Sequence, residues 1–366
     1  MERIKSIDIF RGLSICWMII THLQRGWLAW SDYWVVFVTW SILDVMGVCA
    51  FLFISGVSTM ISFRKRLNKA ERSNDYTKKT IKYEYLIRAL IILAIALAVN
   101  IILAIVNNNA QWIFAWQFLL TLSVSLLLAW PFLRTSKSLR IVFGSIFWFF
   151  NQIVLYILTP YINQLNLGGI IYYLLYTTSE MDSILIFFTF FLIGTVVGEI
   201  IYEIFLIEDK NERITSIKIK LLYPSYIIGS ILILVGIFFD FPEFLNALHR
   251  SFPWMIYSLG IHLILISTLI YLEEIEIFQT KKEYRFLFYF SYYSFTVYAS
   301  HYLLALLFER RLNADNIWIF IIITIILYNT LFRIIYKTLK EKASIKAQIN
   351  NLSVKITRII EERKKN

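Results

Sequence analysis

The sequence has few of the residues from which disulfide, metal or nucleotide sites are built. Only two of its 366 residues are cysteines, Cys16 and Cys49, and both lie inside apolar segments, which argues against a disulfide framework. Histidine occurs only four times. The chain contains no GxxxxGKS/T, no GxGxxG, no HExxH and no CxxC, so ATPase, dinucleotide-binding and zinc-dependent functions lack a motif. We therefore expect no metal.

Charged residues are also scarce, at 17%, whereas hydrophobic residues make up 58% and the mean hydropathy is +0.65. Apolar runs of about 20 residues, long enough to cross a bilayer, recur along the chain. A soluble domain of this length cannot bury so much apolar surface in one core. We therefore expect an all-α, multi-pass integral protein of the cell membrane. Asp8 and Arg11 interrupt the first run and no small-residue cleavage site follows, so this run is predicted to remain as a signal anchor.

The hydropathy pattern predicts a bundle of 10 transmembrane helices, with an eleventh over 161–178 as the alternative. The predicted spans are 9–28, 38–63, 85–106, 112–133, 141–159, 184–206, 221–239, 254–272, 286–306 and 317–336. If the N-terminus is cytoplasmic, most of the 36 Lys and Arg residues fall in the inner segments. The outer side then holds only Arg25, Arg250, Arg310 and Arg311. By the positive-inside rule both termini are predicted to be cytoplasmic. The net charge of +11 then reflects topology, and no nucleic-acid partner is expected.

The domain organisation is expected to be simple. Residues 1–336 are predicted to form one transmembrane domain, and 337–366 a basic cytoplasmic C-terminal helix. Apolar residues in this tail recur at helical spacing, at Ile345, Ile349, Leu352, Ile356 and Ile359. Such a stripe predicts a helix that lies on the membrane or on the bundle. A dimerising coiled coil, and with it a homodimer, is the alternative, although two heptads are short for one.

An arginine and a histidine stand in the first predicted span. His22 follows Arg11 by eleven residues, or about 16 Å along a helix axis. Asp8, three residues before Arg11, is predicted to hold its guanidinium. A guanidinium matches phosphate oxygens, and a desolvated imidazole stays neutral and can accept a proton or attack an acyl carbon. The pair therefore predicts acyl transfer from a phosphate-rich carrier such as acyl-coenzyme A. The structural alternative is that Arg11 reaches the headgroups and His22 contacts a neighbouring helix.

Four further residues are candidates for the catalytic and acceptor sites. His301, in the ninth predicted span, can face His22 or bind the acceptor, or else make a structural contact. Asp44 can orient a histidine or bind an amine, with a helix N-cap as the alternative. Glu180 and Asp182 flank the outer mouth before the sixth span and are candidates for binding substrate, with solvated charges as the alternative.

Cationic residues on the inner side are candidates for further donor contacts. Arg64, Arg66 and Arg88 are predicted to bind donor phosphates, although the positive-inside bias also explains them. Two other histidines are assigned structural roles. His262 is predicted to be a hydrogen-bonded core residue, and His249 to be solvated.

Several stretches resemble a known family. The segments SIDIFRGLSICWMIITH (Ser6 to His22) and FLFISGVS (Phe51 to Ser58) are similar to the heparan-α-glucosaminide N-acetyltransferase catalytic-domain family. Three later pieces, GTVVGE, FPWMIYSLGI and YSFTVYASHYLL, resemble it more loosely. The arginine and histidine, with ten residues between them, are also similar to a motif of the acyltransferase family 3 membrane proteins.

The resemblance implies a membrane acyltransferase of ten or eleven helices. Such an enzyme takes an acyl group, here expected to be acetyl, from cytoplasmic acyl-coenzyme A and delivers it to a carbohydrate or glycolipid acceptor at the outer side. Arg11 would serve the coenzyme A side, His22 would be catalytic, and Asp44 matches an aspartate of the family motif. His22 would act as a base or form an acyl-histidine.

One departure from the family limits what is carried over. The lysosomal branch has asparagine at the position of His22 and a histidine further on, whereas residues 23–43 contain none here. The acceptor chemistry of that branch is therefore not carried over. The rival class is a transporter or exporter of an anionic small molecule, although the five prolines form no matched pair of broken helices.

Overall fold

The structure is a computed structural model that describes residues 3–72, 76–176, 183–239, 251–277 and 285–364. Every regular element in these ranges is a helix, which confirms the all-α prediction. Nine helical segments of the described chain are long and apolar enough to cross a membrane. Helices suit a bilayer because each satisfies its own backbone hydrogen bonds. The chain divides into two compact units, Met1–Ile54 with Glu203–Gln348 and Ser55–Tyr202 with Ile349–Asn366.

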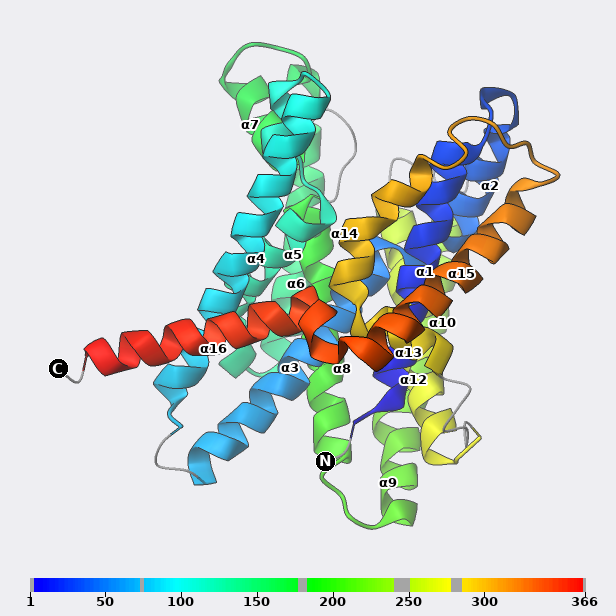
Figure 1. Cartoon of the computed structure of the whole chain (residues 1–366). Helices are drawn as coiled ribbons and strands as arrows, with labels where there is room; N and C mark the ends of the chain where they lie inside the picture. Colours follow the sequence, from blue (N-terminus) through cyan, green and yellow to red (C-terminus); the bar gives the residue numbers. More distant parts are fainter. Residues whose placement is uncertain (1–2, 73–75, 177–182, 240–250, 278–284, 365–366) are drawn as a thin grey trace. The chain divides into compact units, whose positions relative to one another are not determined.

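The first unit is built around α1 (Lys5–Trp27), one of the most buried of the candidate spans. Five of the described helices pack against it: α2 (Trp34–Leu43), α12 (Phe252–Glu274), α13 (Arg285–Tyr292), α14 (Ser294–Ala305) and α15 (Ile317–Thr338) (Figure 1). The unit also contains the start of α3 (Val48–Arg72), α9 (Lys210–Ile217) and α10 (Tyr223–Phe239).

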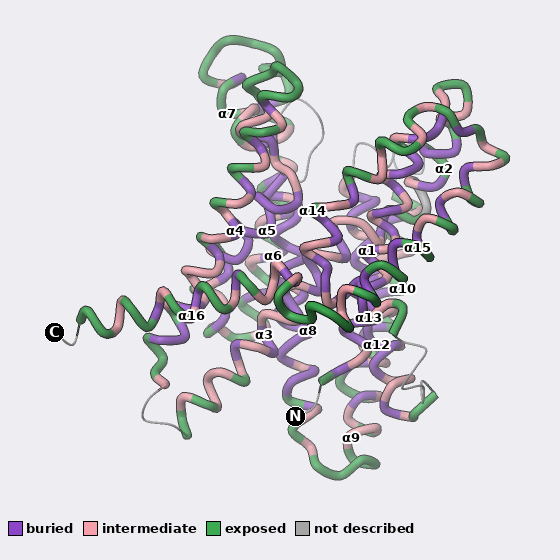
Figure 2. Tube along the Cα trace, viewed as in Figure 1, coloured by how far each residue is buried: buried purple, intermediate pink, exposed green. Residues whose placement is uncertain are grey.

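Apolar residues of α1 form the centre of this unit, drawn as a buried stretch in Figure 2. Ile15, Ile19 and Leu23 recur every four residues, so they share one helix face, and all three are fully buried. On a neighbouring face, a Cβ added to Gly12 would lie 2.5 Å from the carbonyl oxygen of Leu287. Glycine therefore allows α13 to approach the α1 backbone directly.

The second unit contains the rest of α3, together with α4 (Lys78–Val106), α5 (Phe118–Ala129), α6 (Lys137–Leu158), α7 (Leu167–Tyr176), most of α8 (Ile184–Ile204) and most of α16 (Ile345–Arg363). Of the nine candidate spans, α8 is the most buried. Thr77 caps α4, because its hydroxyl accepts from the amide of Thr80, so the helix begins as the chain leaves the α3–α4 turn.

Three predicted spans differ in detail. Residues 286–306 form two helices, α13 and α14, which are separated at Tyr293. A turn at Asp44–Met46 divides α2 from α3 inside the predicted span 38–63. Within 161–178, the described residues 161–176 contribute the ten-residue α7, which is about 15 Å long and too short to cross a bilayer. The number of crossings and the side of the termini remain predictions.

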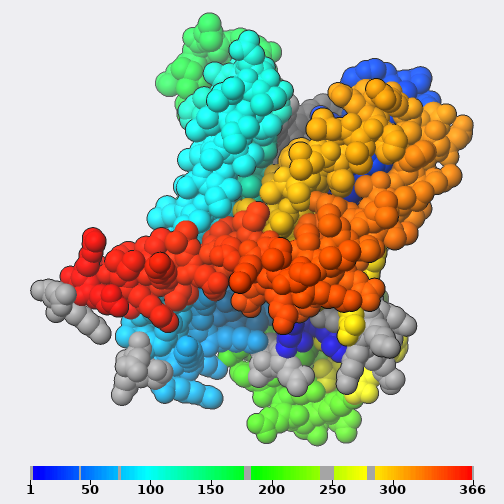
Figure 3. Space-filling model, in the orientation of Figure 1, coloured from blue at the N-terminus to red at the C-terminus, as the bar shows by residue number. Residues whose placement is uncertain are grey.

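The predicted C-terminal helix forms as α16, but it buries a different face. Ile349, Ser353 and Thr357, spaced by four residues, are its buried residues. Leu352 and Ile359, which belong to the predicted apolar stripe, are 46% and 42% exposed. Figure 3 shows this helix, in red, at the surface of the molecule. Hydrogen bonds from Arg66 to Asn350 and from Thr80 to Glu361 join α16 to other helices of its unit, and part of its apolar stripe is left uncovered.

Candidate functional site

His22 and His301 lie side by side in the first unit. Their ring centroids are 4.6 Å apart and the ring planes meet at 61°. Tyr302 packs on both rings, with centroids 5.6 Å from His22 and 4.1 Å from His301. The helices approach closely here because Gly26 of α1 faces Ala305 of α14, where an added Cβ would lie 3.3 Å from that of Ala305.

The hydrogen bonding of His301 determines which of its ring nitrogens is basic. Nδ1 lies 2.5 Å from the carbonyl oxygen of Tyr298, which can only accept, so Nδ1 donates its hydrogen there. The lone pair is then on Nε2, which is buried and has no hydrogen-bond partner among the described residues. An unsatisfied buried nitrogen is costly in a purely structural position. His22 is only partly buried and is the more accessible member of the pair.

Arg11 lies on the same face of α1 as His22, because eleven residues make three helical turns plus about 20°. Its Nη1 donates to Ser291 Oγ at 3.1 Å and lies 3.5 Å from Asp8 Oδ1, which confirms the predicted contact with Asp8. Ser291 in turn donates to Asp8 at 2.8 Å. All three side chains are buried, so this cluster fixes the orientation of the guanidinium.

A carboxylate from α12 positions the start of α1. Glu273 accepts from the backbone amides of Lys5 and Ser6 at 2.8 and 2.7 Å, and from the Ser6 hydroxyl at 2.6 Å. A negative charge at a helix N-terminus is favourable because the first amides have no partner inside the helix. The hydrogen bonds of Glu273 thereby set the position of the α1 turn that carries Asp8 and Arg11.

Asp44 lies beside α1 but next to a different face. Its Oδ1 accepts from Trp17 Nε1 at 3.4 Å, and Trp17 stands five residues before His22, about 140° around the helix. The adjacent Val45 carbonyl lies 2.5 Å from His262 Nε2. His262 is fully buried, as predicted for a core histidine.

The three arginines predicted for the donor belong to the second unit. Arg64 pairs with Glu199, whose other carboxylate oxygen binds the fully buried Arg140. Arg66 pairs with Glu84 at 2.6 Å. Arg66 is therefore neutralised by Glu84, whereas Arg64 shares the single carboxylate of Glu199 with Arg140.

The remaining predicted residues are Arg88, Glu180 and Asp182, and the structure does not place any of them against the two histidines. Arg88 lines a cavity of about 20 Å³ in the second unit. Glu180 and Asp182 lie outside the described residues. Within the described ranges no group of three or more His, Cys, Asp or Glu side chains is placed to hold a metal. Of the predicted catalytic residues, the structure thus brings only His22 and His301 together.

Comparison with known proteins gives a match to one family model. The model described as "Heparan-alpha-glucosaminide N-acetyltransferase, catalytic" matches residues 3–235, more than half of the chain, including Arg11 and His22. The chain belongs to this family. No match was found among curated proteins or solved structures. The family resemblance read from the sequence is thereby confirmed, and a membrane acetyltransferase is the general class to which this family member is assigned.

Three groups around the site of this family member were not predicted from the sequence. Ser291, Tyr302 and Glu273 all lie more than 260 residues from their α1 partners. His301 lies beyond the matched residues 3–235, so the family match does not cover it, but the structure places it against His22, one of the two roles considered for it from the sequence.

Proposed function

We propose that the protein transfers an acetyl group from acetyl-coenzyme A, bound on the cytoplasmic side, to a hydroxyl or amine of a carbohydrate or glycolipid acceptor at the outer side. The observation that carries this proposal is the His22–His301 pair, with ring centroids 4.6 Å apart on a chain of an acetyltransferase family. Two imidazoles in contact, one of them with a buried basic nitrogen, suit proton transfer in acyl chemistry.

In the proposed reaction His22 touches the substrates, because it is the more accessible ring. It takes the proton from the acceptor hydroxyl or amine while that oxygen or nitrogen bonds to the acetyl carbon. The carbon–sulfur bond of the thioester breaks, and the proton passes to the departing sulfur to give free coenzyme A. In the alternative route His22 first displaces the thiol and carries the acetyl group to the acceptor. In the direct route Nε2 of His301 holds the acceptor's proton between its release by His22 and its return through His22 to the sulfur. In the acyl-histidine route Nε2 takes the ring proton that acylated His22 releases and passes it to the thiolate, and the acceptor's own proton returns to His22 when the acceptor displaces it.

Arg11 is the proposed donor-binding residue. A guanidinium presents several N–H groups in one plane, and these hydrogen-bond donors match the spacing of phosphate oxygens. Asp8 and Ser291 both approach the same nitrogen, Nη1, and so hold this planar group in one orientation. Arg64 and Arg66 each pair with a glutamate, so the proposal does not depend on them.

The test is thiol release from acetyl-coenzyme A by the purified protein in lipid discs, with amino sugars, glycans and membrane glycolipids as acceptors. We expect release that is lost in His22→Ala. His262→Asn is the matched control and should keep thiol release. His262 belongs to the same unit, but its ring contacts the backbone carbonyl of Val45. Release that persists in His22→Ala would remove His22 from the reaction. No release and no coenzyme binding would reject acyl transfer and favour the transporter alternative.

A further inference from the structure

The second unit contains a cavity between the end of α3, the start of α4 and the C-terminal helix α16. Its volume is about 420 Å³, which is large enough for a small polar molecule. The residues that define its chemistry are Arg66, Lys69, Tyr76, Glu84 and Arg358. Neither His22 nor His301 lines it, so this cavity is separate from the proposed acetyl-transfer site.

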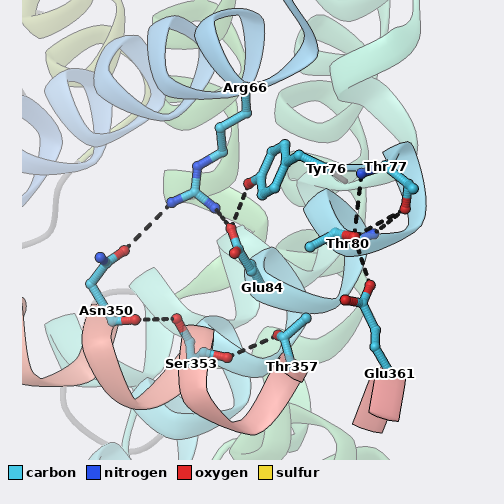
Figure 4. A network of polar contacts seen from close by, with 9 residues as sticks. All are labelled: Arg66, Tyr76, Thr77, Thr80, Glu84, Asn350, Ser353, Thr357 and Glu361. Atoms are coloured by element: carbon cyan, nitrogen blue, oxygen red, sulfur yellow. Dashed lines mark hydrogen bonds and ion pairs between the residues drawn. The ribbon is translucent and has the colours of Figure 1, made fainter. Parts of the chain in front are cut away.

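The inner wall of the cavity is a set of polar groups that are already paired (Figure 4). Arg66 and the Tyr76 hydroxyl both donate to Glu84 at 2.6 Å. Thr80 donates to Glu361 of α16 at 2.6 Å. Burial and the hydrogen bond to Glu84 raise the pKa of Tyr76, so its hydroxyl remains a donor. Both acidic groups of the wall are therefore occupied by neighbours.

The cations near the rim lack such partners. Among the described residues no carboxylate lies within ion-pair distance of Lys69 or Arg358. The Lys69 ammonium lies 4.7 Å from the centroid of the Tyr76 ring, which holds it at the cavity. The lining holds three cations, Arg66, Lys69 and Arg358, and two carboxylates, Glu84 and Glu361, so the cavity carries an excess of one positive charge. A ligand with a phosphate group matches that charge.

Two further observations place this cavity at a membrane surface. Leu352 and Ile359, seven residues apart on α16, are exposed, and Lys355 lies between them on an exposed part of the same helix. An amphipathic helix with exposed apolar residues and basic neighbours is typical of binding to anionic bilayers. Glu84 of the cavity wall stands six residues, about 9 Å, before Leu90, the first exposed large apolar residue of α4. That distance is comparable to the depth of a headgroup layer.

We propose that this cavity binds the headgroup of an anionic phospholipid from the adjoining leaflet. Lys69 and Arg358 contact the phosphate, the Tyr76 hydroxyl faces the same space, and Leu352 and Ile359 of α16 rest on the acyl chains. The site is a lipid-binding site that docks α16, and it is independent of the proposed acetyl transfer.

The test uses the full chain in neutral detergent, titrated with dihexanoyl phosphatidylglycerol and followed by native mass spectrometry. Removing two cations near a membrane surface weakens anionic lipid binding by about tenfold or more. We therefore expect at least a tenfold loss of affinity in Lys69→Gln/Arg358→Gln. The matched control is Lys65→Gln/Arg363→Gln, which removes the same charge from the same two helices, α3 and α16, at residues that do not line the cavity. Equal melting temperatures show that both variants are folded.

Further titrations distinguish the source of the phosphate. Glycerol phosphate, which lacks acyl chains, should bind at least tenfold more weakly than the lipid, and Leu352→Ser/Ile359→Ser should remove that difference. Equal binding of glycerol phosphate and lipid, or displacement of the lipid by coenzyme A, would overturn the assignment to a phospholipid. An equal loss of lipid affinity in Lys69→Gln/Arg358→Gln and in its matched control would show that the cavity is not the binding site.

Discussion

His22 on α1 and His301 on α14 are 279 positions apart in the chain, yet their ring centroids lie 4.6 Å from each other. The tautomer of His301 is fixed by the Tyr298 carbonyl, which leaves Nε2 as the basic nitrogen. Contact between a fixed imidazole and a more accessible one is the feature on which the proposed reaction depends. It leads directly to the first prediction.

Replacement of either histidine by alanine is expected to reduce kcat for thiol release by about 10²- to 10⁴-fold, because each removes a proton-transfer group. Because the two rings act as a unit, the double variant should be little worse than the poorer single variant. Initial rates at saturating acetyl-coenzyme A measure this. Losses that multiply in the double variant would mean that the two histidines act in separate steps.

The donor role of Arg11 predicts a different kinetic signature. Arg11→Lys keeps the charge but loses the planar set of donors, so KM for acetyl-coenzyme A should rise by about tenfold while kcat changes much less. Ser291→Ala, which removes one support of the guanidinium, should shift KM in the same direction by a smaller factor. Direct titration of the coenzyme provides the check. An unchanged affinity of Arg11→Lys for the coenzyme would show that Arg11 does not bind the acyl donor.

The ion cluster in the second unit predicts a stability effect. Glu199→Gln leaves Arg140, which is fully buried, without its carboxylate and should destabilise the protein by about 3 kcal/mol. Arg64→Gln should cost less, because the Arg64 side chain is 32% exposed and the Arg140–Glu199 pair survives. Thermal unfolding of the two variants in the same detergent compares them. Equal melting temperatures of the two variants would contradict the stabilising role of the buried Arg140–Glu199 pair.

Glycine packing gives a prediction about α1. Gly12→Ala places a Cβ 2.5 Å from the Leu287 carbonyl oxygen, so α13 must move, at a cost of about 1–3 kcal/mol. Gly144→Ala in α6 meets only the side chains of Thr189 and Ile193, at 3.3 and 3.7 Å, and should change stability by less than about 1 kcal/mol. Melting temperatures decide this, and a larger shift for Gly144→Ala would contradict the described packing.

Hydropathy alone predicted most of the fold, since spans such as α4, α8, α12 and α15 are long continuous apolar runs. It did not predict the break at Tyr293, where the sequence carries no Pro or Gly, or the turn at Asp44–Met46, where Asp44 and the following Gly47 stand within an otherwise apolar run. Such breaks depend on packing between helices, which a hydropathy pattern does not contain.

The candidate site was predictable only in part, for a related reason. Asp8 and Arg11 are three residues apart, so helix periodicity alone predicted their contact. Ser291 reaches the same cluster from 280 residues away, and no local pattern marks it. The stripe on α16 likewise predicted a helix, but the buried face combines Ile349 of that stripe with Ser353 and Thr357, whose hydroxyls donate to carbonyls within the helix.

The most direct test of the proposed transfer is made in sealed proteoliposomes that hold the protein in one orientation. Acetyl-coenzyme A with a labelled acetyl group is supplied on the side of Arg11, and the accepted glycan or glycolipid on the side of His22. We predict that labelled acetyl appears on the acceptor in the same amount as free thiol appears with the donor, and that His22→Ala abolishes both. Labelled acceptor formed at an undiminished rate by His22→Ala, or none formed by the native chain with any acceptor, would contradict the account.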